Sequence, residues 1–307
     1  MQQSKLFCIL PDYVCTPDGM EIDQYGNLVL SCPNFADDAL SGCVVKIDKA
    51  GNVKKWFDVP VLEETGVARN MGIAFDSEYN VYLCDNQGWS ERPELLYKGR
   101  VLRLKGDDEG NILESRVVAW GMEHPNGIRI RGNYMYVTQS YLHPIHHESG
   151  KLVSGVYRFA LDEENVKVNN DLSDKNLFAT FVRQSLCRQF RRRVDQPHHL
   201  PRGRLPAGKQ GDCEGFFAAR EHGRHDLRRK RKPVHCGLQR ERHRHDDAGR
   251  HDPPDSDGLH GELNQPGEPI VWDGRIIASC FDLVTGPGKV NTGHSMPATL
   301  AQLELER

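Results

Sequence analysis

The chain has 307 residues, of which 38% are hydrophobic and 27% are charged, and its formal net charge is −3. This length allows one large β domain or two ordinary domains, and the absence of any apolar run of about 18 residues excludes a membrane-spanning helix. Met1 to Leu10 lacks the length and the cleavage site of a secretory signal peptide, so we expect a cytoplasmic protein.

Charge is distributed unevenly along the chain. Residues 183–250 carry 16 Arg and 3 Lys against 8 acidic residues, a balance of +11, whereas the rest of the chain has a balance of −14. Two different compositions therefore share one chain, and this difference requires a cause.

A hairpin pattern recurs from the N-terminus onward. Three segments begin with a glycine, alternate apolar and polar residues, turn at Gly or Asn, and end in a second short strand; they cover residues 19–30, 72–83 and 127–137. Their first glycines lie 53 and 55 residues apart. Alternation on both sides of a Gly- or Asn-containing turn predicts a β-hairpin in each segment.

A second hairpin follows each of the first ones. These segments begin at Gly42, Gly99 and Gly155, which lie 57 and 56 residues apart, and they turn near Gly51, Gly110 and Asn165. Four strands within about 55 residues are typical of a propeller blade. A β-sandwich is the alternative, but it does not explain two interleaved motifs that keep one period.

We therefore predict an all-β fold, a six-bladed β-propeller of four-stranded blades. Residues 1–182 would form blades one to three and the start of blade four, and residues 255–307 would form the final blade and the closure of the ring. Blades four and five are predicted to be disrupted, because the repeat stops at Val182 and resumes near Asp255.

Residues 183 to about 254 are rich in Arg, His, Pro and Gly and contain few β-branched residues, so they cannot bury a core as written. One interpretation is a disordered basic insertion. The interpretation we favour is a reading-frame error, because a forward shift of one nucleotide turns an Arg codon into one for Gly, Asp, Ala or Val. With this shift, the codons of residues 183–195 and 224–237 can encode the hairpin pattern of the intact blades.

The intact part of the chain resembles the family of senescence-marker protein, gluconolactonase and luciferin-regenerating enzyme, which are six-bladed propellers. The motifs that carry the resemblance lie at residues 17–23, 69–76, 124–128 and 265–288. The resemblance covers about 1–182 and 255–307. It implies a divalent cation, usually Ca²⁺, at one mouth of the central channel, which polarises a lactone or ester carbonyl while a carboxylate activates water.

This resemblance implies three metal ligands here, namely Asp18, Asn126 and, as a weaker candidate, Asn70. Asp18 stands where the family usually has Glu. Asp and Asn beside glycine also commonly stabilise turns, which is the structural alternative for Asp18 and Asn126. Two further functional positions are missing, one at the junction after Val182 and one at Gly223, which puts the activity of this chain in question.

Substrate contacts are expected from His124, Asn86 and His143. Residues 85–89 form a loop that could line the pocket or be an ordinary turn at a strand end. His143 belongs to a group with His146 and His147 that could suggest a metal site, but an exposed loop over the channel mouth explains the group better.

The predicted function is a metal-dependent hydrolase of small lactones or esters, as the resemblance implies. The missing functional positions allow that this chain has lost the activity. One alternative is a non-catalytic propeller that binds a small molecule or a protein. Another is a nucleic-acid binder acting through residues 183–250, which the absence of a DNA- or RNA-binding motif and of interleaved aromatic residues disfavours.

Overall fold

The computed structural model describes residues 4–90, 93–182, 266–281 and 297–305. These residues form four β-sheets and two short 3₁₀-helices, η1 (Gln87–Ser90) and η2 (Pro93–Leu95), and contain no α-helix. The prediction of an all-β fold is confirmed. In this part of the chain no helix is long and apolar enough to cross a membrane.

Each sheet is a blade of four main strands in antiparallel order. Blade one consists of β2 (Met20–Ile22), β3 (Leu28–Cys32), β4 (Cys43–Ile47) and β5 (Val53–Asp58). Blade two consists of β6 (Asn70–Phe75), β7 (Val81–Asp85), β8 (Gly99–Gly106) and β9 (Ile112–Met122). Blade three consists of β10 (Pro125–Arg131), β11 (Tyr134–Gln139), β12 (Val153–Ala160) and β14 (Leu177–Val182).

The fourth sheet, which we call the closing blade, joins strands from both parts of the sequence. It contains β15 (Pro266–Trp272), β16 (Arg275–Cys280), β17 (Thr299–Glu304) and the N-terminal strand β1 (Lys5–Ile9). β1 pairs with β17 in antiparallel register, so Lys5 lies opposite Gln302 and Ile9 opposite Thr299. The closing blade is therefore complete only when the N-terminal strand is present.

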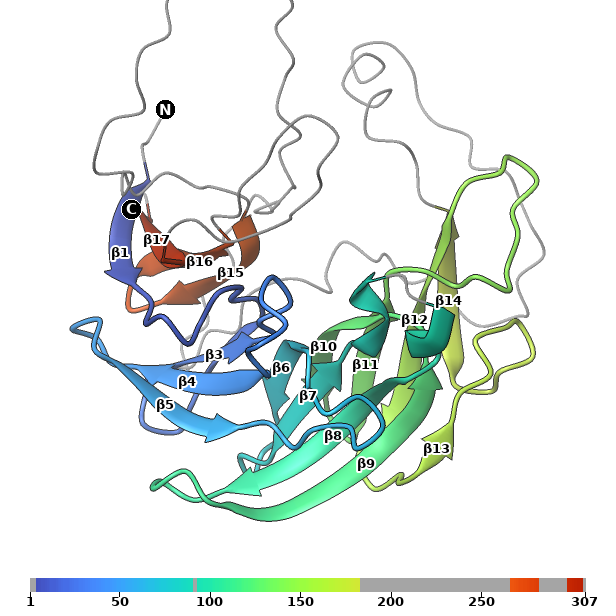
Figure 1. Cartoon of the computed structure of the whole chain (residues 1–307), viewed down its shortest axis with the longest axis horizontal. Helices are drawn as coiled ribbons and strands as arrows, with labels where there is room; N and C mark the ends of the chain where they lie inside the picture. The colour runs from blue at the N-terminus through green and yellow to red at the C-terminus, as the bar shows by residue number, and fades with distance from the viewer. Residues whose placement is uncertain (1–3, 91–92, 183–265, 282–296, 306–307) are drawn as a thin grey trace, which may run out of the picture.

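The blades stand side by side around a common centre, as the fan of sheets in Figure 1 shows. Their first strands contact one another in the order β15, β2, β6 and β10. A Cβ added at Gly19 would lie 2.8 Å from the Cα of Gly72, and one added at Gly72 would lie 2.9 Å from the Cα of Gly127. The repeated glycines thus converge as a propeller requires, because only glycine lets the inner strands approach this closely.

The predicted hairpins are present in blades one and two, with both expected turns in each. Blade three differs in its second half. After the turn near Asn165, β13 (Val166–Lys167) pairs in parallel with β9 of blade two, and β14 takes the place beside β12. Two backbone hydrogen bonds fix β13 against β9; the N–H of Asn165 donates to the Val117 carbonyl and the N–H of Val168 to the Trp120 carbonyl.

Because β14 is the outer strand of blade three, the described residues up to Val182 complete that blade and contain no start of a fourth. The structure therefore supports a propeller with four described blades, and the count of six stays a prediction. Residues 183–254, with the predicted frame error, and the basic stretch 183–250 lie outside the described residues.

Four of the hairpin turns share one local motif, an aspartate followed by an asparagine four positions later. The aspartate Oδ1 accepts the backbone N–H of that asparagine, and Oδ2 accepts from its side-chain amide; the pairs are Asp23–Asn27, Asp48–Asn52, Asp76–Asn80 and Asp107–Asn111. These two side-chain hydrogen bonds close the turn, so strands of three to eleven residues keep a fixed register.

The core lies between the blades. One cluster joins the closing blade to blade one, with Leu300 and Leu30 among its members; a second joins blades one and two, and a third joins blades two and three. Most side chains in β3, β6 and β7 are buried on both faces, since each of these strands packs against neighbours on either side. Burial of these apolar faces holds the blades at a fixed distance.

Candidate functional site

One end of the blades gathers the residues that the sequence analysis selected. Each first strand begins at this end, and the loops between second and third strands lie there too, because neighbouring strands run antiparallel. These loops cover residues 33–42, 86–98 and 140–152. The predicted ligands and substrate contacts all lie at this end, which we call the channel mouth: Asp18, Asn70, Asn86, His124, Asn126 and His143.

Asp18 lies between blade one and the closing blade. Its N–H donates to the carbonyl of Ser31 at 2.9 Å, and its own carbonyl accepts from the Ser279 hydroxyl at 3.0 Å. The carboxylate is buried, with Oδ1 3.3 Å from the place where a Cβ at Gly267 would stand. No donor or cation contacts this carboxylate among the described residues, and burial raises its pKa from 3.8 to about 7.

Asn126 occupies the equivalent position in blade three, directly before the glycine of the repeat. Its side-chain amide Nδ2 donates to the Ser140 hydroxyl at 3.0 Å, which leaves the amide oxygen Oδ1 as the atom suited to a cation. The equivalent residue of blade two is Met71, which is buried. Its thioether is a poor ligand for Ca²⁺, which prefers oxygen.

Asn70 lies one position earlier in the repeat than Asp18 and Asn126, in the place that Pro17 and Pro125 occupy in the other two blades. Its amide Nδ2 donates to the Ser31 hydroxyl at 2.6 Å and to the Cys43 carbonyl at 3.0 Å. Its Oδ1 is buried against Gly42, where a Cβ would lie 2.0 Å away, and it has no hydrogen-bond partner within the described ranges. These contacts tie blade two to blade one, and the role of Asn70 as a ligand stays a prediction.

Further along the first strands, Arg129 of β10 forms an ion pair with Glu268 of β15. β10 belongs to blade three and β15 to the closing blade, which are the two ends of the fan. This ion pair therefore connects the two ends. Burial lowers the pKa of Arg129, while the nearby Glu21 of β2 opposes that shift. The guanidinium also reaches the Ile73 carbonyl of blade two at 3.5 Å, so all four blades contribute a group to the floor below the mouth.

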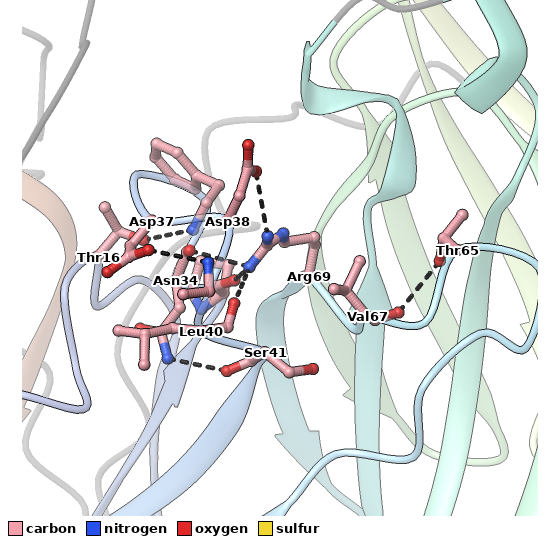
Figure 2. A network of polar contacts seen from close by, with 12 residues as sticks. Thr16, Asn34, Asp37, Asp38, Leu40, Ser41, Thr65, Val67 and Arg69 are labelled. Carbon is pink, nitrogen blue, oxygen red and sulfur yellow. Dashed lines mark hydrogen bonds and ion pairs between the residues drawn. The ribbon is translucent and has the colours of Figure 1, made fainter.

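The rim of the mouth is held by Arg69, which stands directly before β6 (Figure 2). Its Nη1 donates to the carbonyls of Pro33, Asn34 and Leu40 at 3.1, 2.9 and 2.5 Å, and its Nη2 lies 3.6 Å from Asp38 Oδ1. A buried guanidinium with this many acceptors fixes the loop 33–42 against blade two. Arg69 is thus a positioning residue for the rim.

Asp85 and Arg100 form a buried ion pair at the end of β7, with Arg100 Nε 2.7 Å from Asp85 Oδ2. The other oxygen, Asp85 Oδ1, accepts the backbone N–H of Arg69 at 2.8 Å. Asn86 follows and is buried, and its Oδ1 has no hydrogen-bond partner in the part of the chain that the structure describes. The segment 85–89 is therefore more than an exposed turn, because it anchors the start of β6 and carries one unpaired buried oxygen.

His124 and His143 lie together with Tyr141. The His124 and Tyr141 rings are stacked at 6.3 Å with an interplanar angle of 23°, and the Tyr141 and His143 rings are 4.7 Å apart. Glu123, which the sequence analysis missed, is fully buried and contacts His143 through both carboxylate oxygens. No local signal marks Glu123, since its partner comes from a loop twenty residues away.

The oxygen chemistry of Asp18 and Asn126 fits part of a Ca²⁺ site. A buried carboxylate without a donor is the kind of group that a cation stabilises. Among the described residues, no group of three or more His, Cys, Asp or Glu side chains could hold a metal ion. Further ligands would therefore come from amide or carbonyl oxygens, from water, or from residues outside the described ranges.

Comparisons with models of protein families and with characterised protein sequences found no match. Solved structures with related folds include a gluconolactonase from Xanthomonas campestris, at 14% identity and a TM-score of 0.33, covering 54% of this chain and 55% of the other. A luciferin-regenerating enzyme matches at 15% identity and a TM-score of 0.30, covering 50% of each chain. A streptogramin B lyase matches at 14% identity and a TM-score of 0.29, covering 52% of this chain and 47% of the other.

This chain thus matches about half the length of these three proteins. The assignment as a propeller rests on the four radial sheets and the converging glycines of the chain itself.

Proposed function

We propose that this protein is a metal-dependent hydrolase of small lactones or esters, with Ca²⁺ held at the channel mouth in part by Asp18 and Asn126. The observation that carries this proposal is the buried carboxylate of Asp18, which has lost its hydration without gaining a donor among the described residues. A bound cation would supply the missing partner, and it would polarise the carbonyl of a lactone or ester.

The other residues of the mouth have roles that follow from their positions. The ion pair of Arg129 and Glu268 joins the first strands below the mouth, where it would limit how deeply a substrate can enter. His124 and Tyr141 present stacked rings that suit the apolar face of a small ring compound. His143 and the buried amide of Asn86 add polar groups that can orient its oxygens.

A calcium titration combined with a panel of small lactones and esters tests this proposal. We expect Ca²⁺ to raise the melting temperature of the wild-type protein, because a ligand that binds only the folded state stabilises it. Asp18→Asn should abolish that shift, whereas Asp12→Asn, at an exposed position nearby, should leave it unchanged. Lactone hydrolysis should depend on Ca²⁺ in the same way.

The outcomes separate the predicted alternatives. Calcium binding without turnover of any lactone or ester would favour a non-catalytic propeller that binds small molecules. A melting temperature that does not respond to Ca²⁺, together with no hydrolysis, would contradict the proposal.

A further inference from the structure

Glu123 and His143 form a carboxylate–imidazole pair at the channel mouth. The backbone N–H of His143 donates to Glu123 Oε2 at 2.7 Å, and His143 Nδ1 lies 3.2 Å from Glu123 Oε1. The Glu123 side chain is 0% exposed, whereas that of His143 is 55% exposed. A fully buried acid therefore contacts an imidazole that is about half exposed.

This geometry determines which nitrogen of His143 is free. An ionised carboxylate can only accept hydrogen bonds, so Nδ1 must carry the hydrogen that points to Oε1. In the neutral imidazole, Nε2 then holds a lone pair and can accept a proton. The second contact, from the backbone N–H of His143, fixes the loop. Glu123 therefore holds His143 at two points, the backbone nitrogen and the ring nitrogen Nδ1.

The groups around the pair place it within the mouth. Tyr141 lies between the two histidines, stacked on His124 and tilted by 51° against His143. Burial raises the pKa of the nearby Tyr97, and Glu123 and Tyr141 add to this shift. Burial also raises the pKa of Glu123, and the contacts with His143 oppose this shift. Ser140, the neighbour of Tyr141, accepts from Asn126, so the loop of His143 is tied to the first strand of blade three.

We propose that His143 is a general base at the channel mouth and that Glu123 is its positioning residue. The proposal rests on the proposed function for its substrate class, a lactone or ester. His143 Nε2 takes a proton from water as the water oxygen forms a bond to the carbonyl carbon. The imidazolium then returns that proton to the alkoxide oxygen as the carbon–oxygen bond of the ester breaks, so the imidazole ends in its starting form.

A purely structural role for Glu123, as an anchor for the loop 140–152, makes a different prediction. In Glu123→Gln the backbone N–H of His143 still needs an acceptor, so the amide oxygen takes that place. The amide NH₂ then faces Nδ1, which must accept, and the hydrogen of the ring moves to Nε2. This variant keeps the anchor and removes the base.

The tautomer of His143 can be measured directly. Long-range ¹H–¹⁵N NMR on histidine-labelled protein, with His143→Gln to assign the signal, should show hydrogen on Nδ1 in the wild type and on Nε2 in Glu123→Gln. Hydrogen on Nε2 in the wild type, or the same tautomer in both proteins, would overturn the proposal.

Hydrolysis of p-nitrophenyl acetate, assayed without added Ca²⁺, provides the second measurement. We expect His143→Gln and Glu123→Gln to lower the rate by about 100-fold, the scale of general-base catalysis. The matched controls His146→Gln and Glu148→Gln, in the same loop at exposed positions, should keep the wild-type rate. Equal rates in the wild type and His143→Gln would refute the role of His143.

The failure of the proposed function looks different from the failure of this inference. If no lactone is hydrolysed and Ca²⁺ has no effect, but p-nitrophenyl acetate hydrolysis depends on His143 and the tautomer switches in Glu123→Gln, the lactonase proposal fails and the base stands. Circular dichroism and thermal unfolding of each variant show whether a lost rate reflects a lost fold.

Discussion

Asp18 is buried at the channel mouth, and its carboxylate contacts no donor among the described residues. Because its pKa is raised from 3.8 to about 7, the folded protein binds this proton more tightly than the unfolded chain does. The stabilisation from Asp18 is therefore fully present below about pH 4 and is lost as the pH rises through about 7. Above pH 7 the folded protein holds a buried charge, unless a cation compensates it.

Replacement of Asp18 by Asn should reveal this cost. In metal-free buffer at pH 8, we expect Asp18→Asn to be more stable than the wild type by up to about 4 kcal/mol, since each pKa unit is worth about 1.4 kcal/mol. The difference should shrink as the pH falls toward 4. Urea unfolding at pH 4, 6 and 8 measures it, and a variant less stable than the wild type at pH 8 would show that Asp18 has a partner it needs.

At the scale of the strand, the inner glycines determine how closely the blades pack. A Cβ at Gly72 would meet the Asn126 carbonyl at 2.4 Å and the Cα of Gly127 at 2.9 Å, both of which are backbone atoms that cannot rotate away. Among the described residues, a Cβ at Gly127 would meet only the Thr138 hydroxyl, at 3.1 Å. The same repeat position therefore has no room for a Cβ atom in blade two, but almost enough room for one in blade three.

This difference predicts unequal effects of alanine. Gly72→Ala should destabilise the protein by about 1–3 kcal/mol, the usual range for forcing extra atoms into a packed core. Gly127→Ala should cost clearly less, because the Thr138 side chain can shift. Thermal unfolding of the two variants beside the wild type compares them, and equal losses of stability would mean that the inner strands are not in the close contact described.

The hairpins were predictable from the sequence because their signals are local. A glycine start, an alternating strand and an Asp or Asn turn all lie within about ten residues, so each hairpin of blades one and two follows from its own segment. Partners of the site were not predictable in this way. Glu123 and His143, or Arg129 and Glu268, meet only when distant loops or opposite blades come together, and β13 leaves blade three to pair with the preceding blade.

At the scale of the whole molecule, the repeat stops at Val182 and resumes near Asp255. Blade three ends at Val182 and the closing blade begins at Pro266. The proposed frame error would explain why the basic composition is confined to the residues between them. Restoring the frame would return two hairpin patterns, at residues 183–195 and 224–237, to the region between blade three and the closing blade.

The nucleotide sequence across codons 180–256 tests this proposal. We expect that a one-nucleotide shift of the reading frame in this stretch encodes the hairpin pattern. We also expect the frame-restored protein to have a higher melting temperature and to aggregate less, because paired strands remove exposed sheet edges. Genomic sequencing and mass spectrometry of the native protein provide the measurement. A genomic frame that encodes the Arg-rich stretch, matched by its peptides, would establish a true basic insertion.

The pairing of β1 with β17 places one of the earliest strands of the chain beside one of the latest. During synthesis, blades one to three can assemble while β1 is still without its neighbour, since β17 has not left the ribosome. A nascent chain therefore carries an unpaired edge for nearly the whole time of its translation. Any event that halts translation before residue 299 leaves the N-terminal strand free to pair with another molecule.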